Sequence, residues 1–209
     1  MKKNKSIKLN FIMNVILTMS SFIFPLITFP YVSRILLPEG TGKVSFATSL
    51  ISYFSMFAQL GIPTYGIRAC AKVRDDKEEL TRTTQELVII NFVMSVISYT
   101  ALAVALMLVP RLREERALYI IVSLTIAFNV IGMEWMYKAL EQYTYITIRS
   151  IIFKFVALIV MFVFVHQKSD YIFYGAITIL AASGSNIFNF INAHKFIDMR
   201  PAGKYHFKR

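Results

Sequence analysis

Long apolar runs dominate the sequence, and they constrain the fold more than any other feature. Six stretches of about 20 residues are mainly apolar: 11–32, 44–67, 84–109, 117–138, 148–166 and 171–191. A helix of about 20 apolar residues crosses a hydrocarbon layer of about 30 Å. The alternating ten-residue strands of membrane barrels are absent from the sequence. The runs therefore predict an all-α integral membrane protein with six transmembrane helices.

The composition agrees with this class and leaves no room for a separate soluble domain. Hydrophobic residues make up 56% of the sequence and charged residues 17%, with a mean hydropathy of +0.55. Soluble domains have about 45–50% apolar and about 25% charged residues. We expect residues 1–209 to form a single membrane domain that ends in a basic cytoplasmic tail, 192–209. The first apolar run lacks a small-residue cleavage site and is too long for a signal peptide, so we expect it to remain as a span.

The net charge of +11 is unevenly distributed between the two sets of loops. With the N-terminus in the cytoplasm, 17 of the 23 Lys and Arg residues fall in cytoplasmic segments. The opposite side then holds six: Arg34, Lys43, Arg111, Arg113, Arg116 and Lys168. The positive-inside rule therefore predicts that both termini are cytoplasmic. This concentration of Lys and Arg on the cytoplasmic side accounts for the positive net charge, so we expect no nucleic-acid partner.

Cysteine and histidine give no sign of a metal or a cofactor. Cys70 is the single cysteine, which excludes a disulfide framework within the chain. The three histidines, His166, His194 and His206, show no ligand spacing. We expect no metal and no cofactor.

Polar residues form stripes at helical spacing along the first two apolar runs. The first comprises Asn14, Thr18, Ser21, Pro25 and Thr28, and the second Ser45, Thr48, Ser52, Ser55 and Gln59. Each set lies on one face of a helix. The stripes either face each other across a wet cavity or mediate close helix packing, since Ser and Thr favour close approach in membranes. A shorter stripe in the third run contains Asn91, Ser95 and Ser98.

Two connections are polar. Residues 38–43, PEGTGK, predict a tight turn on the outer side, and residues 70–82 carry four acids among their bases. We expect the second to be a solvated cytoplasmic hairpin.

The segment 132–154, GMEWMYKALEQYTYITIRSIIFK, keeps ionisable groups inside or beside apolar runs. On a helix, Glu134, Lys138 and Glu141 share one face, and Glu134 lies on the favourable N-terminal side of Lys138 for an ion pair. The pair is either structural or linked to a proton or a substrate. We expect Lys138, Arg149 and Lys154 to extend to the cytoplasmic interface, because a charge inside the bilayer is costly.

Several motifs together are similar to those of one transporter family. They are FPLITFPYVSRIL at 24–36, GTG at 40–42, GIPTYGIR at 61–68, EWMY at 134–137, YITIRS at 145–150 and NFIN at 189–192. The chain resembles the Wzx-type flippases of O-antigen and capsule repeat units, in the multidrug/oligosaccharidyl-lipid/polysaccharide exporter superfamily. That resemblance covers nearly the whole chain.

The resemblance implies one lobe of a MATE-like two-lobe transporter in the bacterial cytoplasmic membrane, with about six helices in each lobe around a central cavity. This chain would supply the N-terminal lobe. The family moves undecaprenyl-diphosphate-linked oligosaccharides by alternating access, driven by an ion gradient, and is not enzymatic. Expected partners are the lipid-linked oligosaccharide, membrane lipids, a C-terminal half or second copy, and the polymerase and glycosyltransferases of the same pathway.

The chemistry of that substrate selects the candidate site residues. Arginine suits bidentate phosphate contact, so Arg34 near the exit and Arg68 and Arg149 near the entrance are candidates for the diphosphate. The alternative for these three is anchoring at the interface. Stripe residues would bind sugar hydroxyls: Asn14, Ser21, Thr28, Ser52 and Gln59. Glu134 and Lys138 are candidates for ion coupling.

Three other functions remain open at this point. A multidrug exporter lobe shares the architecture, but its sites favour aromatic and carboxylate linings for cations. A second alternative is an inactive, truncated six-helix scaffold that transports nothing. A membrane glycosyltransferase or polymerase is less favoured, because the sequence has no large periplasmic loop with paired acids.

Overall fold

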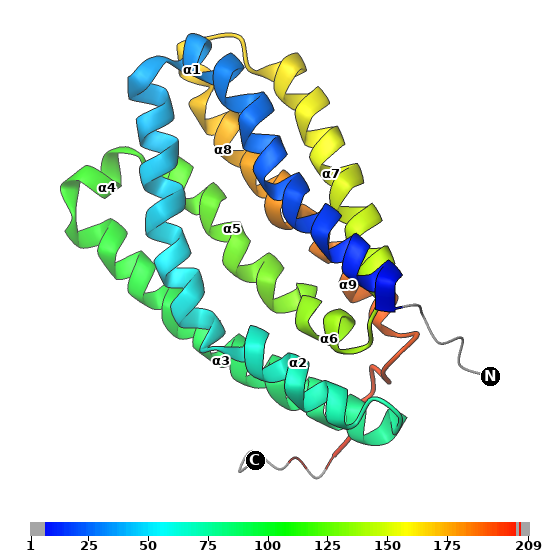
Figure 1. The fold of residues 1–209 in the computed structure, drawn as a ribbon. Helices are drawn as coiled ribbons and strands as arrows, with labels where there is room; N and C mark the ends of the chain where they lie inside the picture. Colours follow the sequence, from blue (N-terminus) through cyan, green and yellow to red (C-terminus); the bar gives the residue numbers. More distant parts are fainter. Residues whose placement is uncertain (1–6, 204, 206–209) are drawn as a thin grey trace.

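The computed structural model describes residues 7–203 and 205, and within them the protein is helical without strands. The helices are α1 (Ile7–Gln59), α2 (Ile62–Lys72), α3 (Lys77–Leu108), α4 (Pro110–Glu114), α5 (Arg116–Gly132), α6 (Glu134–Ala139), α7 (Tyr143–Phe164), α8 (Tyr171–Ile179) and α9 (Asn186–Ala193) (Figure 1). A 3-10 turn, η1 (Lys168–Asp170), precedes α8, and a π-helical turn, η2 (Leu180–Gly184), follows it. The expected all-α class is confirmed. Six of the 17 Lys and Arg residues predicted to be cytoplasmic lie outside the described residues: Lys2, Lys3, Lys5, Lys204, Lys208 and Arg209.

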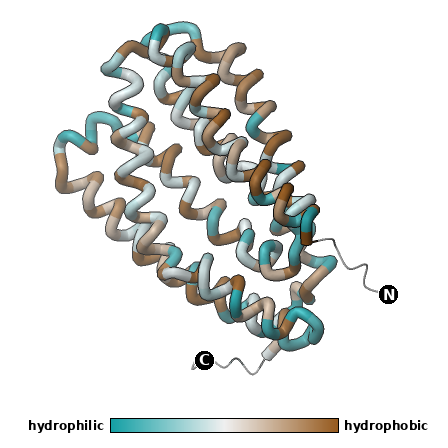
Figure 2. The backbone as a smooth tube through the Cα atoms, in the orientation of Figure 1, coloured by the Kyte–Doolittle hydropathy of each residue, from teal (hydrophilic) through white to brown (hydrophobic). Residues whose placement is uncertain are grey.

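Four stretches are long and apolar enough to cross a membrane: Ile7–Lys72, Lys77–Leu108, Tyr143–Phe164 and Lys168–Ala193. The helix Arg116–Gly132 is apolar but shorter. Many large apolar side chains lie exposed on the outside of the bundle, and Figure 2 shows hydrophobic residues along the helices with hydrophilic ones gathered at the turns. In water such a surface would be unfavourable, whereas lipid chains cover it at no cost. The fold is therefore that of a multi-pass α-helical membrane protein.

Helix α1 reverses direction at a single residue. Leu37 has φ 58° and ψ 178°, and it divides α1 into a first arm (7–36) and a second arm (38–59), which Figure 1 shows as a hairpin. The predicted polar turn over 38–43 is wrong, because these residues already form the first turns of the second arm. Pro38 suits this place, since the first helical residue has no use for a backbone N–H. The Thr41 hydroxyl donates to the Leu37 carbonyl at 2.7 Å.

A second break divides the run that was predicted as one helix over 117–138. Met133, with φ 42°, separates α5 from α6. The Asn189 amide donates to the carbonyl of Gly132 at 2.6 Å, so the carbonyl before the break has a partner. Broken helices are tolerated at membrane depth only where the freed groups are satisfied in this way. The fold thus uses one polar side chain of α9 to stabilise an irregularity in the neighbouring helix.

Polar residues of the third apolar run hold α3 against the second arm. The Asn91 amide donates to the Ala58 carbonyl at 2.8 Å, and the Ser98 hydroxyl donates to the Phe54 carbonyl at 2.8 Å. Both polar side chains are buried. These two residues of the third stripe therefore pack α3 against the second arm.

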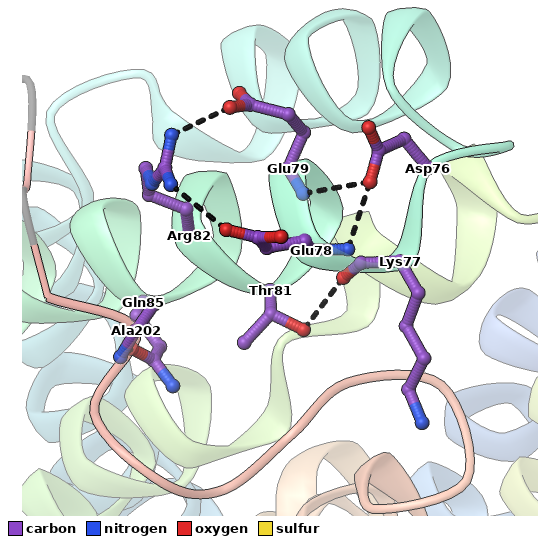
Figure 3. Close-up of polar contacts among 8 residues, drawn as sticks. All are labelled: Asp76, Lys77, Glu78, Glu79, Thr81, Arg82, Gln85 and Ala202. Carbon is purple, nitrogen blue, oxygen red and sulfur yellow. Dashed lines mark hydrogen bonds and ion pairs between the residues drawn. The ribbon is translucent and has the colours of Figure 1, made fainter.

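The connection between α2 and α3 is a capped, charged hairpin (Figure 3). The Asp76 carboxylate accepts from the backbone N–H groups of Glu78 and Glu79 at 2.9 and 3.1 Å, which satisfies the start of α3. Arg82 forms ion pairs with both glutamates. The predicted solvated hairpin is confirmed in its exposed acids. Beyond α9 the chain packs on α3, where Gln85 accepts from the Ala202 N–H at 2.9 Å.

An ion cluster joins three elements at the end of the bundle where α1 reverses. Lys43 of the second arm lies 2.9 Å from Glu115, which precedes α5, and the Tyr171 hydroxyl at the start of α8 donates to Glu115 at 2.7 Å. Burial alone would raise the pKa of Glu115, but the hydrogen bonds from Lys43 and Tyr171 lower it overall. The cluster therefore keeps both charges in place at neutral pH.

Gly66 and Gly42 form a matched pair for testing the packing of α2. A Cβ at Gly66 would lie 2.7 Å from the indole of Trp135, whereas nothing lies within 4 Å of a Cβ at Gly42. We expect Gly66→Ala to destabilise the protein by about 1–3 kcal/mol through overpacking. Gly42→Ala should stabilise it by about 0.5–1 kcal/mol, as in other helix interiors. Thermal unfolding in detergent measures both, and equal effects would contradict the packing of Gly66 on Trp135.

Glu115 should make stability depend on pH in the acid range. Its pKa in the folded protein lies below the ordinary value of 4.5, so its stabilising contribution is present above that value and is lost as pH falls through the folded pKa. Glu115→Gln should cost at most about 1 kcal/mol at pH 7, because solvent screens a partly exposed ion pair. The same change should flatten the loss of stability between about pH 5 and pH 3. Unfolding midpoints over this range provide the measurement. Glu114→Gln, at the exposed neighbouring carboxylate, should leave the acid dependence unchanged.

Candidate functional site

A polar cavity of about 960 Å³ lies between the two arms of α1 and helices α5 to α8. Its wall carries hydroxyl and amide side chains from both arms, α5, α7 and α8: Asn14, Thr18, Ser21, Thr28, Thr48, Ser52, Ser55, Gln59, Thr125, Asn129, Ser150 and Thr178. Three charged side chains complete it, namely Glu134, Lys138 and Lys154. This large hollow, in which polar side chains lie among apolar ones such as Phe24, Ile51 and Val122, is the candidate functional site.

The two predicted stripes meet in this cavity. All five members of the first-arm stripe line it, from Asn14 to Thr28, and so do Thr48, Ser52, Ser55 and Gln59 of the second arm. The reversal at Leu37 causes this arrangement, because it folds the two arms of one continuous sequence against each other. Of the two alternatives for these stripes, the structure supports a shared hollow. Every stripe residue proposed to bind sugar therefore faces the cavity.

The hydroxyl groups of the wall already donate to their own helices. Thr18 donates to the Asn14 carbonyl at 2.9 Å, Ser21 to Leu17 at 3.1 Å and Ser52 to Ser49 at 2.7 Å. A hydroxyl oxygen that donates its proton keeps acceptor capacity. The wall therefore presents mainly hydrogen-bond acceptors to a bound molecule.

The predicted ion pair between Glu134 and Lys138 is confirmed, with Nζ and Oε1 2.8 Å apart. Glu134 is the first residue of α6, where a helix favours negative charge. Glu141 does not share their face, contrary to prediction. Helix α6 ends at Ala139, and Glu141, at φ 54°, pairs instead with Arg74 at 2.7 Å.

Arg149 does not extend to the interface as predicted. Its side chain is 7% exposed and turns into the bundle, where Nη1 donates to the Ser185 carbonyl at 3.0 Å. Nη2 lies 3.9 Å from Glu134, so the carboxylate has a cation on each side. Arg149 is absent from the cavity wall. It fixes α7 to the turn between η2 and α9 and positions Glu134.

Lys154 also lies elsewhere than predicted. It lines the cavity, and its Nζ donates to Ser20 at 2.8 Å and to Ser21 at 2.9 Å. The interface prediction is wrong because α7 begins at Tyr143, before the apolar run that starts at 148. Lys154 therefore lies eleven residues after the first residue of α7 and ten before the last, at the middle of the helix.

Arg34 and Arg68 are exposed and lie outside the cavity wall, Arg34 near the reversal of α1 and Arg68 on α2. The structure therefore does not bring the three predicted arginines together. Sequence reasoning also missed Asn129, whose amide donates to Ser55 at 3.1 Å across the cavity. The signal was present, since Asn129 follows Thr125 by four residues in an otherwise apolar run. Among the described residues, no cluster of His, Cys, Asp and Glu side chains could hold a metal ion.

Comparisons with known proteins concern nearly the whole chain. The sequence profile of the family described as "Polysaccharide biosynthesis protein" matches residues 7–206. A protein of Escherichia coli K12 named "Putative O-antigen transporter" is 28% identical over 171 residues, which cover 81% of this chain and 41% of that protein. A protein of the same name from Shigella dysenteriae is 25% identical over 153 residues, which cover 72% and 38%. The chain thus spans about two fifths of the length of these relatives. No solved structure matches it.

Cysteine labelling tests whether the cavity holds water. Ser52 lines the cavity, whereas Tyr53, next in sequence, is 68% exposed on the outside of the second arm. In a Cys70→Ala background, we expect Ser52→Cys to react with a charged, membrane-impermeant thiol reagent in intact vesicles. Tyr53→Cys should react poorly, because thiolates do not form in hydrocarbon. Equal labelling of the two positions would contradict a hydrated cavity.

Proposed function

Because the chain belongs to the polysaccharide biosynthesis protein family, we propose that it forms one lobe of a flippase for lipid-linked oligosaccharides. The substrate would be an undecaprenyl-diphosphate-linked repeat unit of a surface polysaccharide, carried across the cytoplasmic membrane. The observation that carries this proposal is the convergence of both polar stripes of α1 on one cavity. The names of the two relatives support the same class of cargo.

The cavity wall has the chemistry that a sugar chain requires. A hydroxyl group that enters hydrocarbon without a partner costs roughly 2–7 kcal/mol, so an oligosaccharide needs a polar path. Sugar hydroxyls can donate to the wall oxygens, whose own protons are engaged along their helices. Asn14, Gln59 and Asn129 add amide groups that both donate and accept. Such a surface suits many sugars and favours none strongly.

The diphosphate needs cationic contacts at both sides of the membrane. We propose Arg68, on α2, for the cytoplasmic side and Arg34, near the reversal, for the outer side. Both are exposed, so they can reach a lipid headgroup at the interface. Arg149 is buried against Ser185 and beside Glu134, so we do not propose it for the diphosphate.

Six spans are proposed: the first arm, the second arm with α2, α3, α5 with α6, α7, and η1 to α9. Both ends of the described chain lie at the same end of the bundle (Figure 1). The positive-inside rule assigns that end to the cytoplasm. The second lobe would come from a C-terminal half or from a second copy of the chain. Alternating access of the cavity, coupled to an ion gradient through Glu134 and Lys138, would move the cargo between glycosyltransferases inside and a polymerase outside.

The charges of the cavity wall distinguish this proposal from multidrug export. Lys138 and Lys154 face a single carboxylate, that of Glu134, among the described lining residues. This excess of positive charge would repel a lipophilic cation and would attract a phosphate. The cavity therefore favours an anionic cargo.

A chimera tests the proposal without requiring a native partner. In an O-antigen-producing strain whose transporter gene is deleted, this chain replaces the matched region of the Escherichia coli relative. We expect O-antigen on the cell surface, measured as the lipopolysaccharide ladder on a gel, and no change in drug resistance. Absence of O-antigen from a chimera that is inserted at normal level would contradict the proposal, and so would drug efflux.

The polar stripes supply a matched test within the same chimera. Ser21→Leu combined with Ser52→Leu should lower export about tenfold or more, because two cavity hydrogen-bonding groups are lost at about 1 kcal/mol each. Phe46→Leu, on an exposed residue of the second arm outside the cavity, should leave export unchanged. Immunoblots control for protein level. Full export by the double variant would remove the stripes from the transport path.

A further inference from the structure

A second hollow lies on the outer side of the first arm, where α7 packs against it. This groove has a volume of about 420 Å³ and is lined by apolar side chains such as Val15, Met19 and Ile23 of the first arm and Phe155 and Leu158 of α7. Its polar lining residues are Ser20 and Lys154. It runs along the first arm from Val15 to Ile27, a length of about 18 Å at 1.5 Å per residue. Such a groove fits one extended hydrocarbon chain.

The groove and the polar cavity meet at Lys154. This residue lines both hollows, while Ser20 lines the groove and Ser21 lines the cavity. The ammonium group donates to both serine hydroxyls, at 2.8 and 2.9 Å. Lys154 therefore lies at the contact between the first arm and α7, which we call the seam. It borders the apolar groove on one side and the cavity on the other.

Lys154 forms no ion pair among the described residues. The carboxylate of Glu134 acts on it electrostatically but is paired with Lys138, and the contacts of the Lys154 Nζ within hydrogen-bond distance are hydroxyl groups. Two of the three ammonium protons are engaged by hydroxyls, which leaves one free to bind an acceptor. A cation at membrane depth whose hydrogen-bond partners are neutral is costly, and such residues mark substrate pathways. The complementary ligand is an anion.

The depth of Lys154 decides which anion fits. Lys154 lies about 15 Å from either end of α7 at 1.5 Å per residue, and Ser20 lies near the middle of the first arm. The phosphate of a resident phospholipid stays at the interface, at the edge of a hydrocarbon layer about 30 Å thick. A phosphate at Lys154 must therefore belong to a lipid that is crossing the membrane.

We infer that the seam between the first arm and α7 binds the carried lipid in mid-passage, with its polyprenyl chain in the groove and a phosphate on Lys154. The sugar would then occupy the polar cavity, on the other side of the seam. Ser20 and Ser21 donate their hydroxyl protons to the Leu17 carbonyl and accept from the ammonium group, so they hold Lys154 in place for the phosphate. This inference rests on the proposed function and names the residue that meets the phosphate.

Photo-crosslinking of the purified chain tests the inference without transport. A benzophenone amino acid replaces either Phe155 in the groove or Phe92 on α3, which are 63% and 61% exposed. The chain is reconstituted in phosphatidylcholine vesicles with radiolabelled polyprenyl diphosphate. We expect strong labelling from position 155 and weak labelling from position 92. Equal labelling would overturn the inference, because it would show an unspecific lipid surface.

Variants of Lys154 give the second readout. Lys154→Gln should lower labelling from position 155 about tenfold, the effect of losing a charge-assisted hydrogen bond, whereas Lys154→Arg should keep it within about twofold. Lys168→Gln, an exposed lysine outside the groove and the polar cavity, should have no effect. Unchanged labelling in Lys154→Gln would overturn the role of the charge. Thermal unfolding confirms that each variant is folded.

Competition identifies the ligand in the chain that carries the crosslinker at position 155 and retains Lys154. Unlabelled polyprenyl diphosphate should displace the probe, whereas polyprenol and phosphatidylglycerol should not. Equal displacement by phosphatidylglycerol would assign the groove to a resident phospholipid and overturn the inference. If the chimera exports O-antigen while position 155 stays unlabelled, the inference fails and the proposed function stands. If labelling behaves as expected while export is absent, the seam binds the lipid and the proposed transport fails.

Discussion

Every polar group in this bundle must find a partner, because hydrocarbon offers none. This constraint explains where the polar side chains lie. Asn189 satisfies the carbonyl at the break after α5, and Asn91 and Ser98 bind carbonyls of the second arm. Once these structural needs are met, the remaining polar residues collect around one hollow.

The charged residues obey the same constraint by different means. Glu134 lies between Lys138 at 2.8 Å and Arg149 at 3.9 Å, so its carboxylate is balanced from two directions. Arg149 in turn binds a backbone carbonyl. Lys154 donates to two hydroxyl groups and interacts with Glu134 only at a distance longer than an ion pair. The cavity therefore contains one compensated group of charges and one cation whose partner is incomplete, and this difference in compensation points to the second as the place for an anionic ligand.

Periodicity was sufficient to predict the helices and the polar wall, because one face of a straight helix can be read directly from spacing. The stripes from Asn14 to Thr28 and from Thr48 to Gln59 were found in this way. The positions of Arg149 and Lys154 were not, because they depend on where α7 begins, and Tyr143 and Tyr145 extend it beyond the apolar run. The break at Met133 was also missed. Its carbonyl partner is Asn189, more than fifty residues away in sequence, and no local pattern contains that contact.

The two arms of α1 are held closely together at the reversal at Leu37. One residue makes the turn, Gly40 packs so tightly that a Cβ would lie 3.0 Å from the side chain of Leu36, and Lys43 is tied to Glu115. We therefore expect the hairpin to be rigid at its reversal. Widening of the cavity therefore requires movement of the ends of the arms far from Leu37, or displacement of α7, which contacts the first arm at mid-depth through Lys154 and through apolar side chains.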